Sequence, residues 1–165
     1  MMTVPSPAIG TKYPLLFTFR DTLFGNGFVV EVQASNGRAL CVHEDDQYWV
    51  YGINPGGVSV CGDDPEAARA AFRQTFSNVL VDLAFVSNSI EQFRSSVDQF
   101  FNETNDGYVP DWQEAVGFVQ RGQVTLAGVP LAPANSQRSI TVSLKPVENI
   151  RAQDNSSSLQ YLLAA

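Results

Sequence analysis

The chain has 165 residues, of which 44% are hydrophobic and 16% are charged, so it can build a folded core and lacks the composition of a disordered protein. It carries 17 acidic residues against 10 lysines and arginines, and the resulting net charge of −7 disfavours general binding to nucleic-acid phosphates. The same charge favours a basic protein as a partner.

The N-terminal part of the chain lacks the features of a membrane or export segment. No stretch approaches the roughly 20 apolar residues that a membrane-spanning helix needs. Pro5, Pro7, Lys12 and Pro14 interrupt the beginning of the chain and leave no continuous apolar signal-peptide segment. We therefore expect a cytoplasmic protein with no membrane contact, in which residues 1–12 form a flexible arm.

Alternating apolar runs predict a meander of antiparallel strands. Residues 13–19 read as a first strand, and residues 28–33 and 38–43 as two more. Asn36-Gly37 separates the last two runs, and this pair is typical of a tight hairpin turn. Residues 48–51 predict a further strand.

A break and a short strand complete the meander. Asn54-Pro55-Gly56-Gly57 interrupts the pattern, because proline cannot donate to a strand ladder and the glycines favour a bend. Residues 58–61 then predict a short fourth strand.

Three helices are predicted after the meander. Asp63-Asp64-Pro65-Glu66 is typical of a helix start, with an aspartate cap and a proline in the first turn. Its apolar stripe should pack on the sheet and consists of Ala68, Phe72, Phe76, Val79, Leu80 and Leu83. A second helix is predicted over residues 90–104 after a cap at Ser89, and a short third helix over residues 112–119. Residues 13–122 would form the main domain.

The C-terminal part has a weaker pattern. Residues 124–131 predict a strand or an extended segment, and residues 139–144 alternate clearly enough to predict a strand. We expect residues 123–146 to pack on the domain and residues 147–165 to form a poorly ordered tail with a short helix near 159–163. The complete prediction is an α+β fold: an antiparallel sheet of three to five strands with an amphipathic helix on one face, a second long helix and a C-terminal strand.

The two cysteines, Cys41 and Cys61, each fall in a strand-like run. We expect two small buried thiols in a reducing compartment, and a disulfide is the alternative if their strands are neighbours. A zinc site is not expected, because His43 is the single histidine and the cysteines are far apart in sequence. No other cofactor is predicted.

Six carboxylates and no lysine or arginine lie between Arg38 and Arg69. The carboxylates are Glu44, Asp45, Asp46, Asp63, Asp64 and Glu66. Three interpretations are open: a solvated edge, a docking face for a basic partner, and a divalent-metal site of a nuclease. Solvation in a turn and capping of a helix already account for these residues, so the metal site is the least favoured of the three.

No catalytic motif is recognisable. His43 has no sequence-defined partner acid or nucleophile, and no serine–histidine, cysteine–histidine or phosphate-loop pattern is present. The strand aromatics near Trp49 lack the basic neighbours of a nucleic-acid binder, which favours a role in core or interface packing. We therefore predict a binding protein and not an enzyme.

The run WVYGINPGGVSVCGDDPEAARAAFRQTFSNVL, residues 49–80, resembles the central pattern of HicB-type antitoxin domains. That pattern is an aromatic strand, a proline-containing bend before a glycine, a short strand, a glycine, an acidic helix start and Glu-Ala leading an amphipathic helix. The matching positions are Trp49, Pro55, Gly56, Gly62, Asp63, Glu66, Ala67 and Phe72.

The resemblance implies a degenerate RNase H-like fold that binds and masks a small basic ribonuclease toxin and associates with itself. The residues expected to bind the partner are Glu44, Asp45, Asp46, Trp49, Asp63 and Asp64. Antitoxins of this kind commonly end in a DNA-binding module, but only about twenty polar residues follow the strand predicted at 139–144. Operator binding is therefore not expected, and an orphan structural or regulatory oligomeric subunit without a toxin is an alternative.

Overall fold

A long antiparallel hairpin of β1 (Lys12–Phe24) and β2 (Val29–Glu44) forms the centre of the structure. The computed structural model describes residues 11–145 and 158–165. The other strands are β3 (Gln47–Asn54), β4 (Ser59–Gly62), β5 (Leu131–Ala132), β6 (Ser139–Leu144) and β7 (Ser158–Ala164). The helices are α1 (Pro65–Val86), α2 (Ile90–Asn102), the 3-10 turn η1 (Asp106–Tyr108) and α3 (Val109–Gln120).

The strands form one seven-stranded sheet in the order β4-β3-β2-β1-β7-β5, with β6 also paired to β2. Strand β2 is long enough to hold two neighbours end to end on one edge: residues 30–35 pair with β6 and residues 38–44 with β3. The α+β class is confirmed. The sheet is wider than the three to five strands predicted, because β5, β6 and β7 join it after the helices. It is also mixed and not purely antiparallel as predicted, since β5 pairs with β7 in parallel.

The turn predicted at Asn36-Gly37 is wrong, because β2 continues through both residues. The register between β1 and β2 shifts here: Phe17 lies opposite Gly37, and Phe19 lies opposite Ala34. Asn36 has a φ of 56°, which is the left-handed conformation that an Asn-Gly pair tolerates in a bulge as well as in a turn. A side chain at Gly37 would collide with the ring of Phe17.

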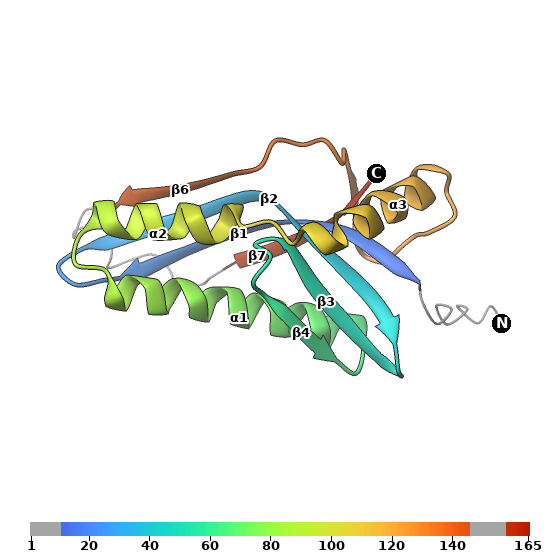
Figure 1. Cartoon of the computed structure of the whole chain (residues 1–165), viewed down its shortest axis with the longest axis horizontal. Coiled ribbons are helices and arrows are strands. Elements are labelled where there is room, and N and C mark those ends of the chain that lie inside the picture. Colours follow the sequence, from blue (N-terminus) through green and yellow to red (C-terminus); the bar gives the residue numbers. More distant parts are fainter. Residues whose placement is uncertain (1–10, 146–157) are drawn as a thin grey trace.

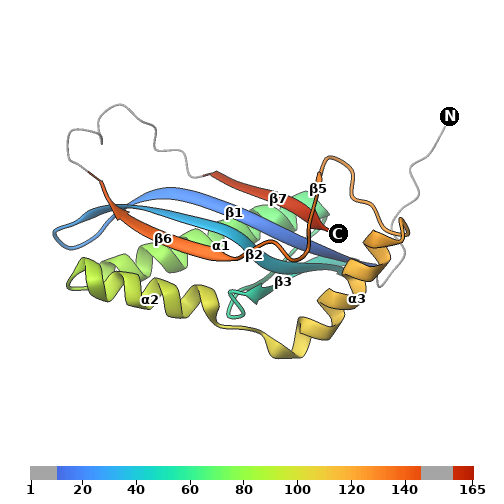
Figure 2. The same cartoon turned by 90° about the horizontal axis from the view of Figure 1, so that it is seen from above.

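Helices cover both faces of the sheet (Figures 1 and 2). Helices α1 and α2 pack on one face, over a core that includes Phe17, Val32 and Val50. Helix α3 covers part of the opposite face, where Trp112 and Val116 pack on Leu40. No described helix is both long and apolar enough to cross a membrane.

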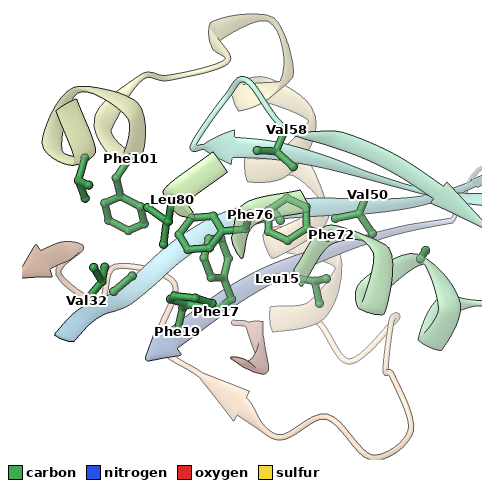
Figure 3. Close-up of a cluster of buried hydrophobic side chains, with 14 of the residues drawn as sticks. Leu15, Phe17, Phe19, Val32, Val50, Val58, Phe72, Phe76, Leu80 and Phe101 are labelled. Atoms are coloured by element: carbon green, nitrogen blue, oxygen red, sulfur yellow. The ribbon is translucent and has the colours of Figure 1, made fainter. Parts of the chain in front are cut away.

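Aromatic rings fill the larger core (Figure 3). The ring centroid of Phe17 lies 5.3 Å from that of Phe72 and 5.4 Å from that of Phe76, both in edge-to-face geometry. Phe19 lies 4.8 Å from Phe76, and Phe101 reaches the same cluster from α2. This packing ties β1 to both helices, because edge-to-face pairs add to the free energy of apolar burial.

The helix starts agree with the sequence. The side chain of Asp64 accepts a 2.7 Å hydrogen bond from the backbone N–H of Ala67, and Ser89 caps α2 by accepting from the N–H of Gln92. The predicted stripe of α1 is only partly buried: Ala68, Phe72, Phe76 and Leu80 are fully covered. Val79 and Leu83, which lie at the sides of the stripe, are half-buried.

The C-terminal prediction requires a correction. Residues 159–163 are not helical but belong to β7, which pairs with β1 from Leu15 to Arg20. Leu163 and Ala164 are buried, so this end of the predicted tail is part of the sheet. The strand predicted within residues 124–131 is limited to β5 at residues 131–132, whereas β6 matches the predicted 139–144. Residues 1–10 of the predicted arm and 147–157 of the predicted tail lie outside the described residues.

We expect Phe76→Ala to lower the free energy of unfolding by about 3–5 kcal/mol, because it removes a fully buried ring that contacts both the sheet and α2. Urea unfolding followed by circular dichroism measures this loss. Phe85→Ala is the matched control, since Phe85 lies on the same helix and is 75% exposed. Equal losses in the two variants would contradict the core described above.

Candidate protein-binding surface

The two acidic turns lie at the same end of the sheet. Strands β2 and β3 are joined by a turn at Asp45 and Asp46. Strand β4 runs back along β3, and the pairing of Gly62 with Tyr48 brings the start of α1 beside that turn. The ends of β2 and β4 and the starts of β3 and α1 meet at the lower right of Figure 1.

The four aspartates of these turns are exposed and have no ion pair with any described residue. Asp45, Asp46, Asp63 and Asp64 are all exposed. Among the residues that the structure describes, the ion pairs are Lys12–Asp111 and Arg20–Glu31, and neither involves this end of the sheet. The result is a negative surface that no described lysine or arginine neutralises by an ion pair. We call it the acidic end (residues 44–46, 63, 64 and 66).

Local geometry explains three of these aspartates. Asp45 has a φ of 54° and Asp46 a φ of 61°, so both adopt the left-handed conformation of a two-residue hairpin turn. Aspartate and asparagine adopt it more readily than most residues. Asp64 is the cap of α1. Replacement by asparagine at these positions removes charge and keeps the turn and the cap.

A stack of three aromatic rings adjoins the acidic end. The rings of Trp49 and Tyr51 are nearly parallel with centroids 5.9 Å apart, and Tyr51 stacks on Tyr108 at 4.5 Å. The hydroxyl of Tyr51 donates a 2.6 Å hydrogen bond to Oε1 of Glu44. Burial and then this bond to the carboxylate raise the pKa of Tyr51. Glu44 is therefore held in place, unlike the exposed aspartates beside it.

Strand β4 is an edge of the sheet. It has four residues, and its strand pairing within the described residues is with β3 alone. Ser59 and Cys61 are exposed along it. An edge with unpaired backbone N–H and C=O groups is the structure to which a partner strand can add. The acidic end, the β4 edge and Trp49 form one candidate surface.

The cysteines differ from the prediction of two buried thiols. Cys41 is buried, but Cys61 is exposed because it lies on the short edge strand. Both are free: Cys41 lies on β2 and Cys61 on β4, with β3 between them, so the disulfide alternative is excluded by the strand order. Burial raises the pKa of the Cys41 thiol to about 12.

His43 stacks on Tyr48 with ring centroids 4.4 Å apart. Its Nδ1 atom is buried and has no hydrogen-bond partner among the described residues. In residues 11–145 and 158–165, no three histidine, cysteine, aspartate or glutamate side chains come together in a group that could hold a metal ion. The acidic turns therefore approach each other without forming a metal-binding constellation.

Sequence reasoning identified the acidic turns and Trp49 but missed their aromatic neighbours. The strand aromatics, Tyr51 among them, are expected to pack in the core or in an interface, but the sequence gives no sign of the stack between Tyr51 and Tyr108. Tyr108 reaches Tyr51 from η1. No local pattern relates these two residues, because their contact depends on how the α2–α3 connection crosses the sheet.

Comparisons of the chain with family models, with curated proteins and with solved structures find no match. The acidic end, the β4 edge and the sequence pattern of residues 49–80 are therefore the features from which a function can be inferred.

The two thiols should react at very different rates. We expect Cys61 to react rapidly with a disulfide reagent such as Ellman's reagent at mildly alkaline pH. Cys41 should react only on unfolding, because it is buried and its raised pKa keeps it protonated. Cys61→Ser should abolish the fast phase and leave the slow one. Equal rates in the native wild-type protein would contradict the burial of Cys41.

Proposed function

We propose that this chain is a non-enzymatic, cytoplasmic HicB-like antitoxin-type protein that binds and masks a small basic ribonuclease toxin. The observation that carries the proposal is the convergence of two unneutralised acidic turns beside an open strand edge. A basic protein is the partner whose charge complements that surface.

Each part of the surface has a separate role in this proposal. The carboxylates speed encounter, because surface charge mainly raises association rates and acts over about 8–10 Å at physiological salt. The β4 edge offers backbone hydrogen bonds to a strand of the partner. Trp49, which is half-buried and stacked on Tyr51, offers an aromatic anchor of the kind that concentrates binding energy.

The positions that resemble the HicB pattern have consistent places in this fold, which supports the proposal. Trp49 lies in the strand next to the edge, and Phe72 is fully buried under the sheet. Gly62 lies against the first turn of α1, where an added Cβ would be 2.5 Å from the backbone nitrogen of Ala68. The glycine therefore permits the close approach between β4 and α1 that places Asp63 beside the β2–β3 turn.

The partner to test first is a short basic protein encoded beside this chain. Replacing Asp45, Asp46, Asp63 and Asp64 by asparagine should slow association with it by about tenfold at low salt. The two rates should approach each other as ionic strength rises, because salt screens the charges that differ. Stopped-flow fluorescence measures both rates, and the ribonuclease activity of the partner reports whether it is masked.

A control must separate local charge from net charge. Two double variants each remove two charges from the acidic end: Asp45→Asn/Asp46→Asn and Asp63→Asn/Asp64→Asn. The control is a third double variant, Asp82→Asn/Glu91→Gln, which removes two charges from exposed positions of α1 and α2. We expect the control to associate at nearly the wild-type rate. An unchanged rate in the quadruple acidic variant would show that the acidic end is merely solvated.

The alternative of an orphan oligomeric subunit is favoured by a different observation. Large apolar side chains are exposed near the C-terminal ends of β1, α1 and β6, which lie at the end of the sheet opposite the acidic turns (Figure 1). Phe24 is 62% exposed, Phe85 75%, Val86 65% and Leu144 62%. The side chain of Asn26 donates to the backbone oxygen of Phe85 and fixes the end of α1 against the β1–β2 turn. Exposed apolar groups that cluster are typical of association surfaces.

This alternative predicts that Phe85→Ser lowers the oligomeric state measured by light scattering without changing thermal stability. A monomeric wild-type protein over the micromolar range would remove the alternative. Association with a basic toxin and self-association at the opposite end are compatible, so the two measurements are independent.

A further inference from the structure

A polar cluster lies where β3 ends and β6 begins along β2, outside the surface described above. Its centre is Asn54, whose side chain is fully buried. The Oδ1 atom of Asn54 accepts from Nε of Arg38 at 2.8 Å and also from Nη2 of the same residue. It accepts a further bond from Nη1 of Arg138 at 3.3 Å. On its other side, Asn54 donates to Oγ1 of Thr104 at 2.7 Å.

The two guanidinium groups of this cluster have no carboxylate partner in the part of the chain that the structure describes. Among residues 11–145 and 158–165, the ion pairs involve Lys12 and Arg20, and no acidic oxygen of these residues lies within 4.0 Å of Arg38 or Arg138. Arg138 donates in addition to Oδ1 of Asn102, which is again a neutral group. In a chain with 17 acidic residues and 10 lysines and arginines, two neighbouring cations are thus left uncompensated by any described carboxylate.

Like charges held together are costly unless something offsets them. Burial lowers the pKa of Arg38, and the positive charge of Arg138 lowers it further. The guanidinium of Arg38 lies 5.3 Å from the ring centroid of Trp112, a cation–π contact that orients its plane. The cluster therefore fixes two arginines in position without neutralising them.

The arginines also keep donors that no described residue uses. A guanidinium has five N–H donors, and a single amide oxygen offers only two lone pairs to the three N–H groups that converge on it here. Both arginines are half-buried, so part of each remains at the surface. Two arginine forks are the arrangement that proteins use to bind phosphate or carboxylate oxygens bidentately.

We propose that Arg38 and Arg138, oriented by Asn54, Asn102 and Trp112, form a binding site for one phosphate group. The anion supplies the negative charge that the cluster lacks and accepts the unused N–H groups. The rest of the chain limits the ligand to a small one, because a net charge of −7 repels an extended polyanion.

The first test is titration of the wild-type protein with inorganic phosphate at about 150 mM sodium chloride. We expect saturable one-to-one binding by calorimetry and selective shifts of the Arg38 and Arg138 guanidinium signals in nitrogen–proton NMR spectra. Titration with AMP distinguishes free phosphate from a nucleotide as the source of the group, and acetate tests whether a carboxylate suffices. Absence of saturation up to about 10 mM phosphate would overturn the proposal.

Variants then locate the site. Arg138→Gln and Arg38→Gln should each weaken phosphate binding at least about tenfold. Arg138→Lys keeps the charge but loses the fork, so it should weaken binding severalfold. The matched control is Arg121→Gln, which removes the same charge from an exposed position at the C-terminal end of α3. An equal loss in this control, or binding of RNA but not of inorganic phosphate, would also overturn the proposal.

Folding defects do not prevent a decision. Arg138 precedes β6 and is half-buried, so its two variants test the site even if Arg38→Gln does not fold. Circular dichroism establishes which variants are folded. The NMR titration of the wild-type protein depends on no substitution, and shifts confined to other arginines would place the anion elsewhere and refute the site.

Discussion

The pairing of β1 with β2 is the interaction on which the rest of the structure depends. The two strands are paired from Lys12 opposite Val42 to Phe24 opposite Val29, and every other strand except β4 and β5 is hydrogen-bonded directly to one of them. The hairpin is buried on both faces near its middle, since Leu15 faces α1 and Leu16 faces α3. The bulge opposite Phe17 allows the two strands to pair closely while the Phe17 ring stays in the core. Gly37 leaves room for this ring, which three other phenylalanines contact.

The same hairpin explains why charge gathers at one end. In an antiparallel meander, alternate connections fall at the same end of the sheet, so the β2–β3 turn and the β4–α1 junction must be neighbours once β2, β3 and β4 pair in order. Sequence alone could predict this, because both acidic segments follow strands of recognisable length. The positive φ values at Asp45 and Asp46 and the cap at Asp64 add a local reason for aspartate, but none of them requires the absence of lysine and arginine between Arg38 and Arg69.

Local patterns predicted local structure, and they failed where distant segments decide the outcome. The caps of α1 and α2 and the alternation of β6 were readable because each depends on a few consecutive residues. The turn expected at Asn36-Gly37 is absent because this pair suits a bulge as well as a hairpin. Strand β1 pairs with β2 on both sides of these residues, and this long pairing selects the bulge. Leu159 to Leu163 is an apolar run without a clear period, and it becomes a strand because β1 offers it a free edge. Two features join residues from separate elements, so no spacing in the sequence predicts them. They are the Trp49–Tyr51–Tyr108 stack and the Arg38–Asn54–Arg138 cluster.

The two charged features are chemically separable, although Arg38 and Glu44 lie on the same strand. The acidic end acts through long-range attraction, so any salt that raises the ionic strength weakens it to a similar extent. The arginine pair would act through direct hydrogen bonds to one anion. Binding at this site therefore depends on which anion is present and not only on the ionic strength. Sodium chloride and sodium phosphate at equal ionic strength should therefore have the same effect on partner association, whereas phosphate should raise the thermal stability of the wild-type protein more than that of Arg138→Gln, which experiences the same general stabilisation by an excluded salt. This difference follows because only a ligand that binds the folded state preferentially stabilises it by mass action.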